Sequence, residues 1–172
     1  AIRFTVNKRM KHAGNLYIEQ FGEDAVYPVC SPNLLQHMDI NKPEDLMKCN
    51  LVSFANNTMM TWRKWFENAG VVDSNIPLQE TLVSSSDMAL SAVLSGHGVA
   101  LASSAFICRY IESNQLIVPF NISHPHQWQR YFVYDLDSPR LARIKKFADW
   151  IKAEFSDYTP PISSRKNNYV DV

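Results

Sequence analysis

Between positions 51 and 120, apolar residues switch repeatedly between two patterns. Four short extended runs have the composition of strands: 51–54, 78–83, 99–102 and 116–120. Three segments between them repeat apolar residues every three or four positions, as helices with one buried side do: 62–69, 86–94 and 104–111. This alternation of strands and helices predicts an α/β fold with a mostly parallel sheet and helices on its faces.

The flanking regions predict further elements. Extended runs are expected at 1–4, 16–21, 25–30 and 128–136, with a polar loop at 5–15, a turn at 22–24 and a short helix at 43–47. Pro28 favours an edge or crossing strand, and Ser31-Pro32 is expected to end it. A long closing helix has one apolar side: Leu141, Ile144, Ala148, Ile151 and Phe155. The tail from 156 is polar and is expected to fray.

The helix expected at 86–94 has clear signals at both ends. Ser84, Ser85 and Ser86 can accept hydrogen bonds from free backbone N–H groups, and an acidic residue follows in the first turn. Gly96 and Gly98 are expected to end the helix, since glycine takes a left-handed backbone at low cost. Further on, Asn114 is expected to end the next helix in the same way.

Composition and charge exclude several classes of protein. The 172 residues are 46% hydrophobic, which is enough for a core, and Lys+Arg equals Asp+Glu at 17 each. A neutral chain lacks the basic footprint of a nucleic-acid-binding module, and no apolar run is long enough to span a membrane. The three cysteines are far apart and form no metal-ligand spacing, so reduced thiols in a cytoplasmic protein are expected, with no metal and no cofactor.

The serine-rich helix start is the best candidate for a functional site. A helix N-terminus carries free N–H donors and a partial positive charge, and flanking hydroxyls add further donors for a carboxylate or another anion. One serine is enough for an ordinary cap, whereas Ser84, Ser85 and Ser86 lie in a row at the end of a strand. Phe54, Ala55 and Asn56 follow the preceding strand in the equivalent place, so their amides are expected to line the same crevice.

Two other patterns have simpler interpretations. Ser95 and His97, with Asp87, suggest a small α/β hydrolase, but the G-x-S-x-G elbow is missing, and a helix end beside a glycine cap is favoured. Trp62 and Trp65 fall at helical spacing and are expected in the core rather than stacked on a ligand.

A histidine-rich segment raises the question of a metal site. His124 and His126 could bind a metal together with His12 or His37, but they have no cysteine or acidic partner nearby, and a solvated loop is favoured.

Several stretches together resemble LysR-type transcriptional regulators, in the branch typified by the glycine-cleavage activator. They occur in the family's order: AIRF at 1–4, VYPVCSP at 26–32, LVSF at 51–54, WRKWFENAG at 62–70, SDMAL…GHGVAL at 86–101 and LIVPF at 116–120. The resemblance covers about residues 1–155. It implies an effector-binding domain with two lobes like those of periplasmic binding proteins (type 2), the first lobe being incomplete here.

The resemblance also implies where the lobes and the effector lie. Residues 1–25 and 130–155 would belong to lobe I, 26–129 to lobe II with its crossing strands, and 156–172 to a flexible tail. The effector would bind between the lobes. Its implied contacts are Phe4, Thr5, Val6, Phe54, Ala55, Asn56, Ser84, Ser85 and Ser86.

The function expected from the resemblance is that of a sensor. A small molecule, expected to be anionic, would favour one lobe arrangement and so change subunit packing in a homodimer or homotetramer. DNA would be bound only through the N-terminal winged helix-turn-helix, which is absent here, so the chain is expected to be a fragment. The resemblance also implies a cytoplasmic location and no membrane partner. The main alternative is a periplasmic solute-binding protein of a transporter.

Overall fold

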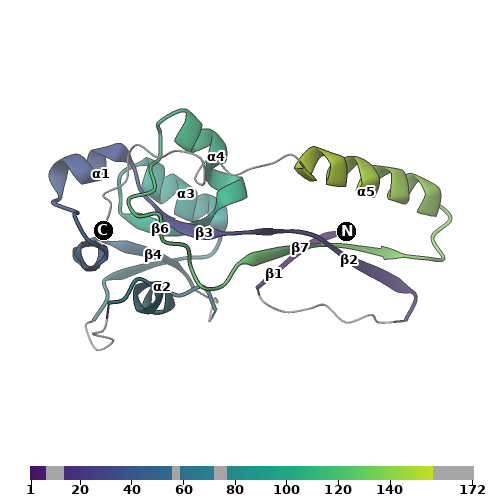
Figure 1. The fold of residues 1–172 in the computed structure, drawn as a ribbon, viewed down its shortest axis with the longest axis horizontal. Helices are drawn as coiled ribbons and strands as arrows, with labels where there is room; N and C mark the ends of the chain where they lie inside the picture. The colour runs from purple at the N-terminus through teal and green to yellow at the C-terminus, as the bar shows by residue number, and fades with distance from the viewer. Residues whose placement is uncertain (7–13, 56–58, 72–76, 157–172) are drawn as a thin grey trace. The chain divides into compact units, whose positions relative to one another are not determined.

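A computed structural model describes residues 1–6, 14–55, 59–71 and 77–156. The described chain divides into two compact units. Unit 1 contains residues 1–24 and 127–156, and unit 2 contains residues 25–126. Each unit has its own sheet (Figure 1).

Unit 1 is an antiparallel sheet with one helix on it. Its strands β1 (Ile2–Val6), β7 (Trp128–Asp135) and β2 (Leu16–Asp24) are paired in the order β1-β7-β2. Helix α5 (Leu141–Ser156) runs along this sheet (Figure 1). Ala148 is buried against it, whereas Leu141, Ile144 and Ile151 are half-buried, which agrees with the apolar side expected from the sequence.

The turn expected at 22–24 is wrong, because these residues continue strand β2. The pairing with β7 shifts register between Gln20 and Gly22, which is a β-bulge. Gly22 lies opposite Arg130, and a Cβ at this position would come within 2.6 Å of the Arg130 Nη2 atom. The glycine therefore makes room for a side chain of the neighbouring strand, which local sequence alone does not reveal.

Unit 2 has a mostly parallel sheet, as expected. Its strands β3 (Val26–Val29), β6 (Val99–Ser103), β4 (Leu51–Phe54) and β5 (Glu80–Val83) are paired in the order β3-β6-β4-β5. Strand β4 is parallel to both neighbours, and β3 is antiparallel to β6. Pro28 therefore lies on an edge strand, where its missing N–H is tolerated.

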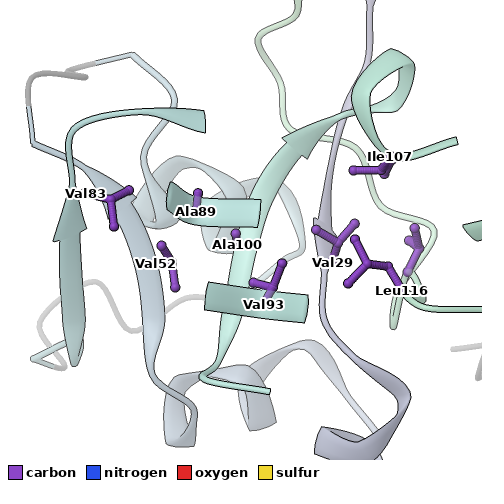
Figure 2. Close-up of a cluster of buried hydrophobic side chains, with 9 residues drawn as sticks. Val29, Val52, Val83, Ala89, Val93, Ala100, Ile107 and Leu116 are labelled. Atoms are coloured by element: carbon purple, nitrogen blue, oxygen red, sulfur yellow. The ribbon is translucent and has the colours of Figure 1, made fainter. Parts of the chain in front are cut away.

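Helices cover both faces of this sheet. Helices α3 (Ser86–Leu94) and α4 (Ser104–Glu112) lie on one face, and α2 (Trp62–Asn68) lies on the other (Figure 1). Between α3, α4 and the sheet is a closed apolar cluster (Figure 2). Its buried members are Val29, Val52, Val83, Ala89, Val93, Ala100, Ile107, Leu116 and Val118.

The tryptophans of α2 belong to the core, as expected. Trp62 and Trp65 are fully buried and pack edge to face, with ring centroids 5.8 Å apart. Each indole N–H is also satisfied: that of Trp62 donates to the Val52 carbonyl at 3.2 Å, and that of Trp65 donates to the Ile122 carbonyl at 2.8 Å. Both side chains thus combine large apolar burial with a polar anchor.

Three other expected elements differ from the structure. Ser31-Pro32 ends strand β3 but also starts a short helix, α1 (Pro32–His37), because proline suits the first helical position. The helix expected at 43–47 is a 3₁₀ helix, η1 (Pro43–Lys48). The run 116–120 makes only one isolated bridge, between Cys30 and Ile117. Its apolar pattern indicates burial without a strand, since the side chains at 116, 118 and 120 are in the core.

The helix ends follow the expected chemistry. After α3, the Gly96 N–H donates to the Val93 carbonyl and the His97 N–H donates to the Ala92 carbonyl, the pair of bonds of a Schellman motif. Asn114 closes α4 with a positive φ of 56°, as expected. A Cβ on Gly98 would lie 2.1 Å from a backbone oxygen of Asn50, so this position has no room for a side chain.

Candidate functional site

Two strand ends in unit 2 bring polar groups to one edge of the sheet. Strands β4 and β5 are parallel neighbours with Phe54 opposite Val83, so both carboxyl ends lie at the same edge. The Ala55 N–H donates to the Val83 carbonyl at 3.0 Å, which extends this pairing one step beyond strand β4. Segments 54–55 and 84–86 therefore leave the sheet side by side. Asn56, the third residue expected there, lies outside the described residues.

The three serines at the start of α3, Ser84 to Ser86, have different roles. Ser85 is the N-cap, and its side chain accepts from the Met88 N–H at 3.3 Å. Ser84 and Ser86 are exposed, and the Ser84 hydroxyl reaches the Met88 sulfur at 3.3 Å. One serine thus satisfies the cap, while two exposed hydroxyls flank the helix start. Together with the partial positive charge of the helix end, this arrangement suits an oxyanion.

The other expected contact residues differ in their surroundings. Phe54 is half-buried and packs against the apolar cluster of unit 2, whereas Ala55 is exposed. Phe4, Thr5 and Val6 are in β1 of unit 1, on an edge strand, and Phe4 is 50% exposed. The structure thus brings 54–55 and 84–86 together within unit 2, while a ligand-binding role for the nine residues stays a prediction.

The hydrolase interpretation has no geometric support. Ser95 is the C-cap of α3, and His97 follows it in the exposed turn. Asp87 is in the first turn of the same helix, eight residues earlier, which corresponds to a separation of about 12 Å along the axis. These three side chains cannot act as a triad at that distance.

The solvated loop expected around His124 is wrong for that residue, which is only 1% exposed. The His126 N–H donates to His124 Nδ1 at 3.0 Å, so this nitrogen must be an acceptor and the proton is on Nε2. Nε2 is 3.2 Å from the Thr61 carbonyl, to which it donates. Burial lowers the pKa of His124 below its usual range. The neutral ring thus joins Thr61, the N-cap residue of α2, to His126 in the segment before β7.

Among the described residues, no group of three or more His, Cys, Asp or Glu side chains is arranged to hold a metal ion. All three cysteines are free thiols, as expected, and burial raises the pKa of Cys30 to about 12, which suppresses its reactivity. Within the described residues, no helix is long and apolar enough to cross a membrane.

Sequence reasoning missed one buried ion pair in unit 1. Arg130 Nη2 lies 3.2 Å from Asp24 Oδ1, and both side chains are more than nine-tenths buried. The sequence contained a signal for this buried charge. Arg130 lies two positions from both Trp128 and Phe132 in β7, so it shares a face of the strand with these two aromatic residues. Asp24 was missed because the sequence pattern predicted a turn at 22–24, where the structure has a strand.

Residues 1–156 match the model described as LysR substrate binding domain. The Glycine cleavage system transcriptional activator of Escherichia coli K12 is 32% identical over 140 residues, which is 81% of this chain and 45% of the relative. Its homolog in Haemophilus influenzae is also 32% identical, over 80% of this chain and 44% of the relative. The chain thus spans about half the length of the curated relatives it matches.

Solved structures show the same fold. The effector domain of AmpR from Pseudomonas aeruginosa superposes with a TM-score of 0.68 at 22% identity, over 90% of this chain and 71% of that chain. The regulatory domain of AphB from Vibrio vulnificus gives a TM-score of 0.61 at 19% identity, over 88% of this chain and 74% of that chain. These relatives are regulators and regulator domains rather than hydrolases, and their effector domains have the periplasmic-binding-protein-like type 2 fold. The chain belongs to the family of LysR substrate binding domains.

Proposed function

We propose that this chain is the effector-sensing part of a LysR-type transcriptional regulator and that it binds a small anionic metabolite. The observation that carries the proposal is the pairing of the β4 and β5 ends, where the Ala55 N–H donates to the Val83 carbonyl. It brings Ala55, which is exposed, beside the serine-rich N-terminus of a nine-residue helix. Family membership supports a sensing role, because the curated relatives are transcriptional regulators.

The residues proposed to contact the effector come from both units. Unit 1 supplies the end of β1, and unit 2 supplies the two strand ends and the start of α3. The full proposed set is Phe4, Thr5, Val6, Phe54, Ala55, Asn56, Ser84, Ser85 and Ser86. In unit 2 the chemistry is that of amide N–H groups and hydroxyls around a helix end, which recognises an oxyanion without a buried countercharge.

The proposed mechanism is a shift between conformations. An effector that binds one arrangement of the protein more tightly than another shifts the population toward it. In a homodimer or homotetramer acting in the cytoplasm, this shift would change the geometry that an N-terminal winged helix-turn-helix presents to DNA. A periplasmic solute-binding protein would have the same fold, so the fold does not separate the two roles. The curated relatives, which are regulators of transcription, favour the sensing role.

A thermal-shift screen of the 172-residue chain tests the proposal. The panel contains amino acids, small carboxylates and inorganic phosphate, each beside a neutral analogue where one exists. At a hundredfold excess over its dissociation constant, a ligand should add about 2.7 kcal/mol to the free energy of unfolding. Ser84→Ala combined with Ser86→Ala should lower the affinity of the chain for that ligand, since two hydroxyls beside the helix end are lost.

The matched control is Ser95→Ala, which removes an exposed serine from the opposite end of α3. It should leave the affinity unchanged. The proposal fails if no anion of the panel stabilises the chain, or if the variants at the two ends of α3 lose affinity equally.

A further inference from the structure

The segment that leads out of unit 2 is held by a buried histidine. The described part of unit 2 ends at His126, and the chain continues from Gln127 into strand β7 of unit 1. His124, two residues before this end, is only 1% exposed. Its backbone N–H donates to the carbonyl of Val26, at the start of β3, at 2.7 Å. His124 thus ties the last residues of unit 2 to the first strand of the same unit.

Two backbone groups of His126 lie within reach of one nitrogen of this ring. The His126 N–H donates to His124 Nδ1 at 3.0 Å, while the His126 carbonyl oxygen lies 3.3 Å from the same nitrogen. In the neutral ring Nδ1 carries no proton and can only accept, so the N–H is its partner. Once Nδ1 gains a proton it can only donate, so the carbonyl becomes its partner and the N–H loses its acceptor. The proton on Nδ1 therefore decides which of the two groups is bound.

The other ring nitrogen keeps its role in both states. Nε2 donates to the Thr61 carbonyl at 3.2 Å in the neutral ring, and it still carries its proton in the imidazolium form. A charged ring therefore stays attached to Thr61, the N-cap residue of α2. The response to a proton is thus confined to the side of the ring that faces His126.

The surroundings determine when the ring takes up a proton. Burial is the largest cause that lowers the pKa of His124, and the positive charges of His126 and of Lys64 on α2 act in the same direction. The hydrogen bonds to the backbone of Thr61 and His126 oppose this shift. Pro125 is exposed and His126 is half-buried, so solvent reaches the turn beside the ring. The ring is therefore neutral at neutral pH and takes a proton from solvent in acid.

We infer that His124 is a proton-operated switch of the segment that connects unit 2 to unit 1. At neutral pH its Nδ1 atom holds the His126 N–H and fixes the peptide that precedes Gln127. In acid Nδ1 donates to the His126 carbonyl instead, and the released N–H turns away from the ring. The backbone thereby changes direction at the point where the chain leaves unit 2. The switch involves no residue of the proposed effector site, so it does not depend on that proposal.

NMR of the ring nitrogens in the 172-residue chain tests the first step. The ¹⁵N shifts of His124, followed from pH 7.5 to pH 5, report whether each nitrogen carries a proton. We expect a neutral ring with its proton on Nε2 at pH 7.5, and protons on both nitrogens in acid while circular dichroism still shows a folded chain. A proton on Nδ1 at pH 7.5 would overturn the inference, as would a ring that stays neutral until the chain unfolds.

The backbone amides test the second step. Exchange of the amide hydrogen of residue 126 with solvent, corrected for the intrinsic effect of pH, should be roughly fivefold or more faster when the ring is charged, because one hydrogen bond is lost. The amide of His124 donates to Val26 in both states and is the internal control. The amide shift of Gln127 should follow the titration curve of the ring. Equal acceleration at 124 and 126 would mean general loosening in acid and would contradict a switch.

Two variants separate the ring of His124 from that of its neighbour. His126→Gln removes the second titratable ring and keeps the backbone groups at 126, so the change in amide exchange with pH should persist. His124→Asn keeps an acceptor oxygen near the position of Nδ1 but gains no proton in this range, so the change should disappear. Loss of the change in the His126 variant, or its persistence in the His124 variant, would assign it to another group.

Discussion

The two units differ in how their sheets are covered and in what their interiors contain. In unit 2, helices cover both faces of the sheet, and the strands at its centre, β4 and β6, carry fully buried residues such as Leu51 and Val99. In unit 1, α5 is the helix on the sheet, the edge strand β1 exposes Ile2 and Phe4, and the interior contains an ion pair. Unit 2 therefore resembles an ordinary α/β core, whereas unit 1 combines exposed apolar surface with a buried charge.

This difference bears on function. Unit 2 offers an anion only neutral donors, the amides and hydroxyls at the ends of its strands. The charge in the interior of unit 1 is that of Arg130, whose Nε and Nη1 atoms are buried without a hydrogen-bond acceptor among the described residues. A mostly apolar core stabilises a fold by burial, whereas a buried ion pair adds little net stability but is costly to break on one side. We therefore expect substitutions in the core of unit 2, and substitutions at the Arg130 ion pair of unit 1, to act mainly on folding.

The largest effect is expected from Trp65→Ala in unit 2. This side chain is fully buried and loses both its apolar contacts and the hydrogen bond to the Ile122 carbonyl. The free energy of unfolding, measured by urea denaturation, should fall by about 3–5 kcal/mol. Trp150→Ala, on the exposed side of α5 in unit 1, is the matched control and should cost less than about 1 kcal/mol. Equal losses would remove the contrast between the units.

A comparable but smaller loss is expected when the buried ion pair of unit 1 is broken on one side. Arg130→Gln alone leaves the Asp24 carboxylate buried without its cation and should cost about 3 kcal/mol in urea denaturation. The double substitution with Asp24→Asn should recover part of that loss. Lys152→Gln tests the more exposed pair with Glu19 and should change stability by less than about 1 kcal/mol. A double variant no more stable than the single one would contradict the account of this pair.

An intermediate effect is expected from acid, through His124 in unit 2. Because burial lowers the pKa of this ring in the folded state, the unfolded chain binds a proton that the folded chain excludes. Stability is therefore complete above about pH 6.5 and falls as the pH drops below that value. Neighbouring Lys64 and His126 act in the same direction, since their charges also oppose a cation at His124.

Urea denaturation at pH 7.5 and pH 5.5 measures this effect. His124→Asn should lose about 1–3 kcal/mol at pH 7.5, where its buried partners lose the ring, and should show less dependence on pH than the parent chain. His37→Asn, in the exposed last turn of α1, should keep the parent's dependence. An equally steep dependence in the His124 variant would assign the acid sensitivity to other groups.

The smallest effect is expected at the start of α3. Ser85→Ala removes the N-cap hydrogen bond to the Met88 N–H and should cost about 1 kcal/mol. Ser86→Ala, one position further and exposed, should leave stability nearly unchanged. Differential scanning calorimetry resolves the two. A larger loss for Ser86 than for Ser85 would mean that the cap is assigned to the wrong serine.

Sequence patterns predicted unit 2 better than unit 1, for a physical reason. The parallel core depends on local signals: a short apolar run for β4, a serine cap for α3, and a left-handed stop at Asn114. The apolar run at 116–120 was wrongly predicted to be a strand, because buried apolar residues need not pair with a neighbouring strand. In unit 1 the decisive features are pairings between distant residues, such as Gly22 with Arg130, and periodicity along one strand does not contain them.

The candidate site shows the same division. The position of Ser84–Ser86 beside the end of β4 follows from the rule that parallel strands end at one edge, so the sequence was sufficient. The burial of His124 and the ion pair of Arg130 depend on partners more than 60 residues away, Thr61 for the first and Asp24 for the second.

The most direct test of the sensor account is a titration followed by two-dimensional ¹H–¹⁵N NMR of the 172-residue chain. The titrant is the anion that gives the largest thermal stabilisation. The account predicts that the amides of Ala55, Ser85 and Ser86 shift together along one saturable curve, with a single dissociation constant, while those at the opposite end of α3, such as His97, stay in place. Saturable shifts confined to other parts of the chain, or no saturable shift at all, would contradict it.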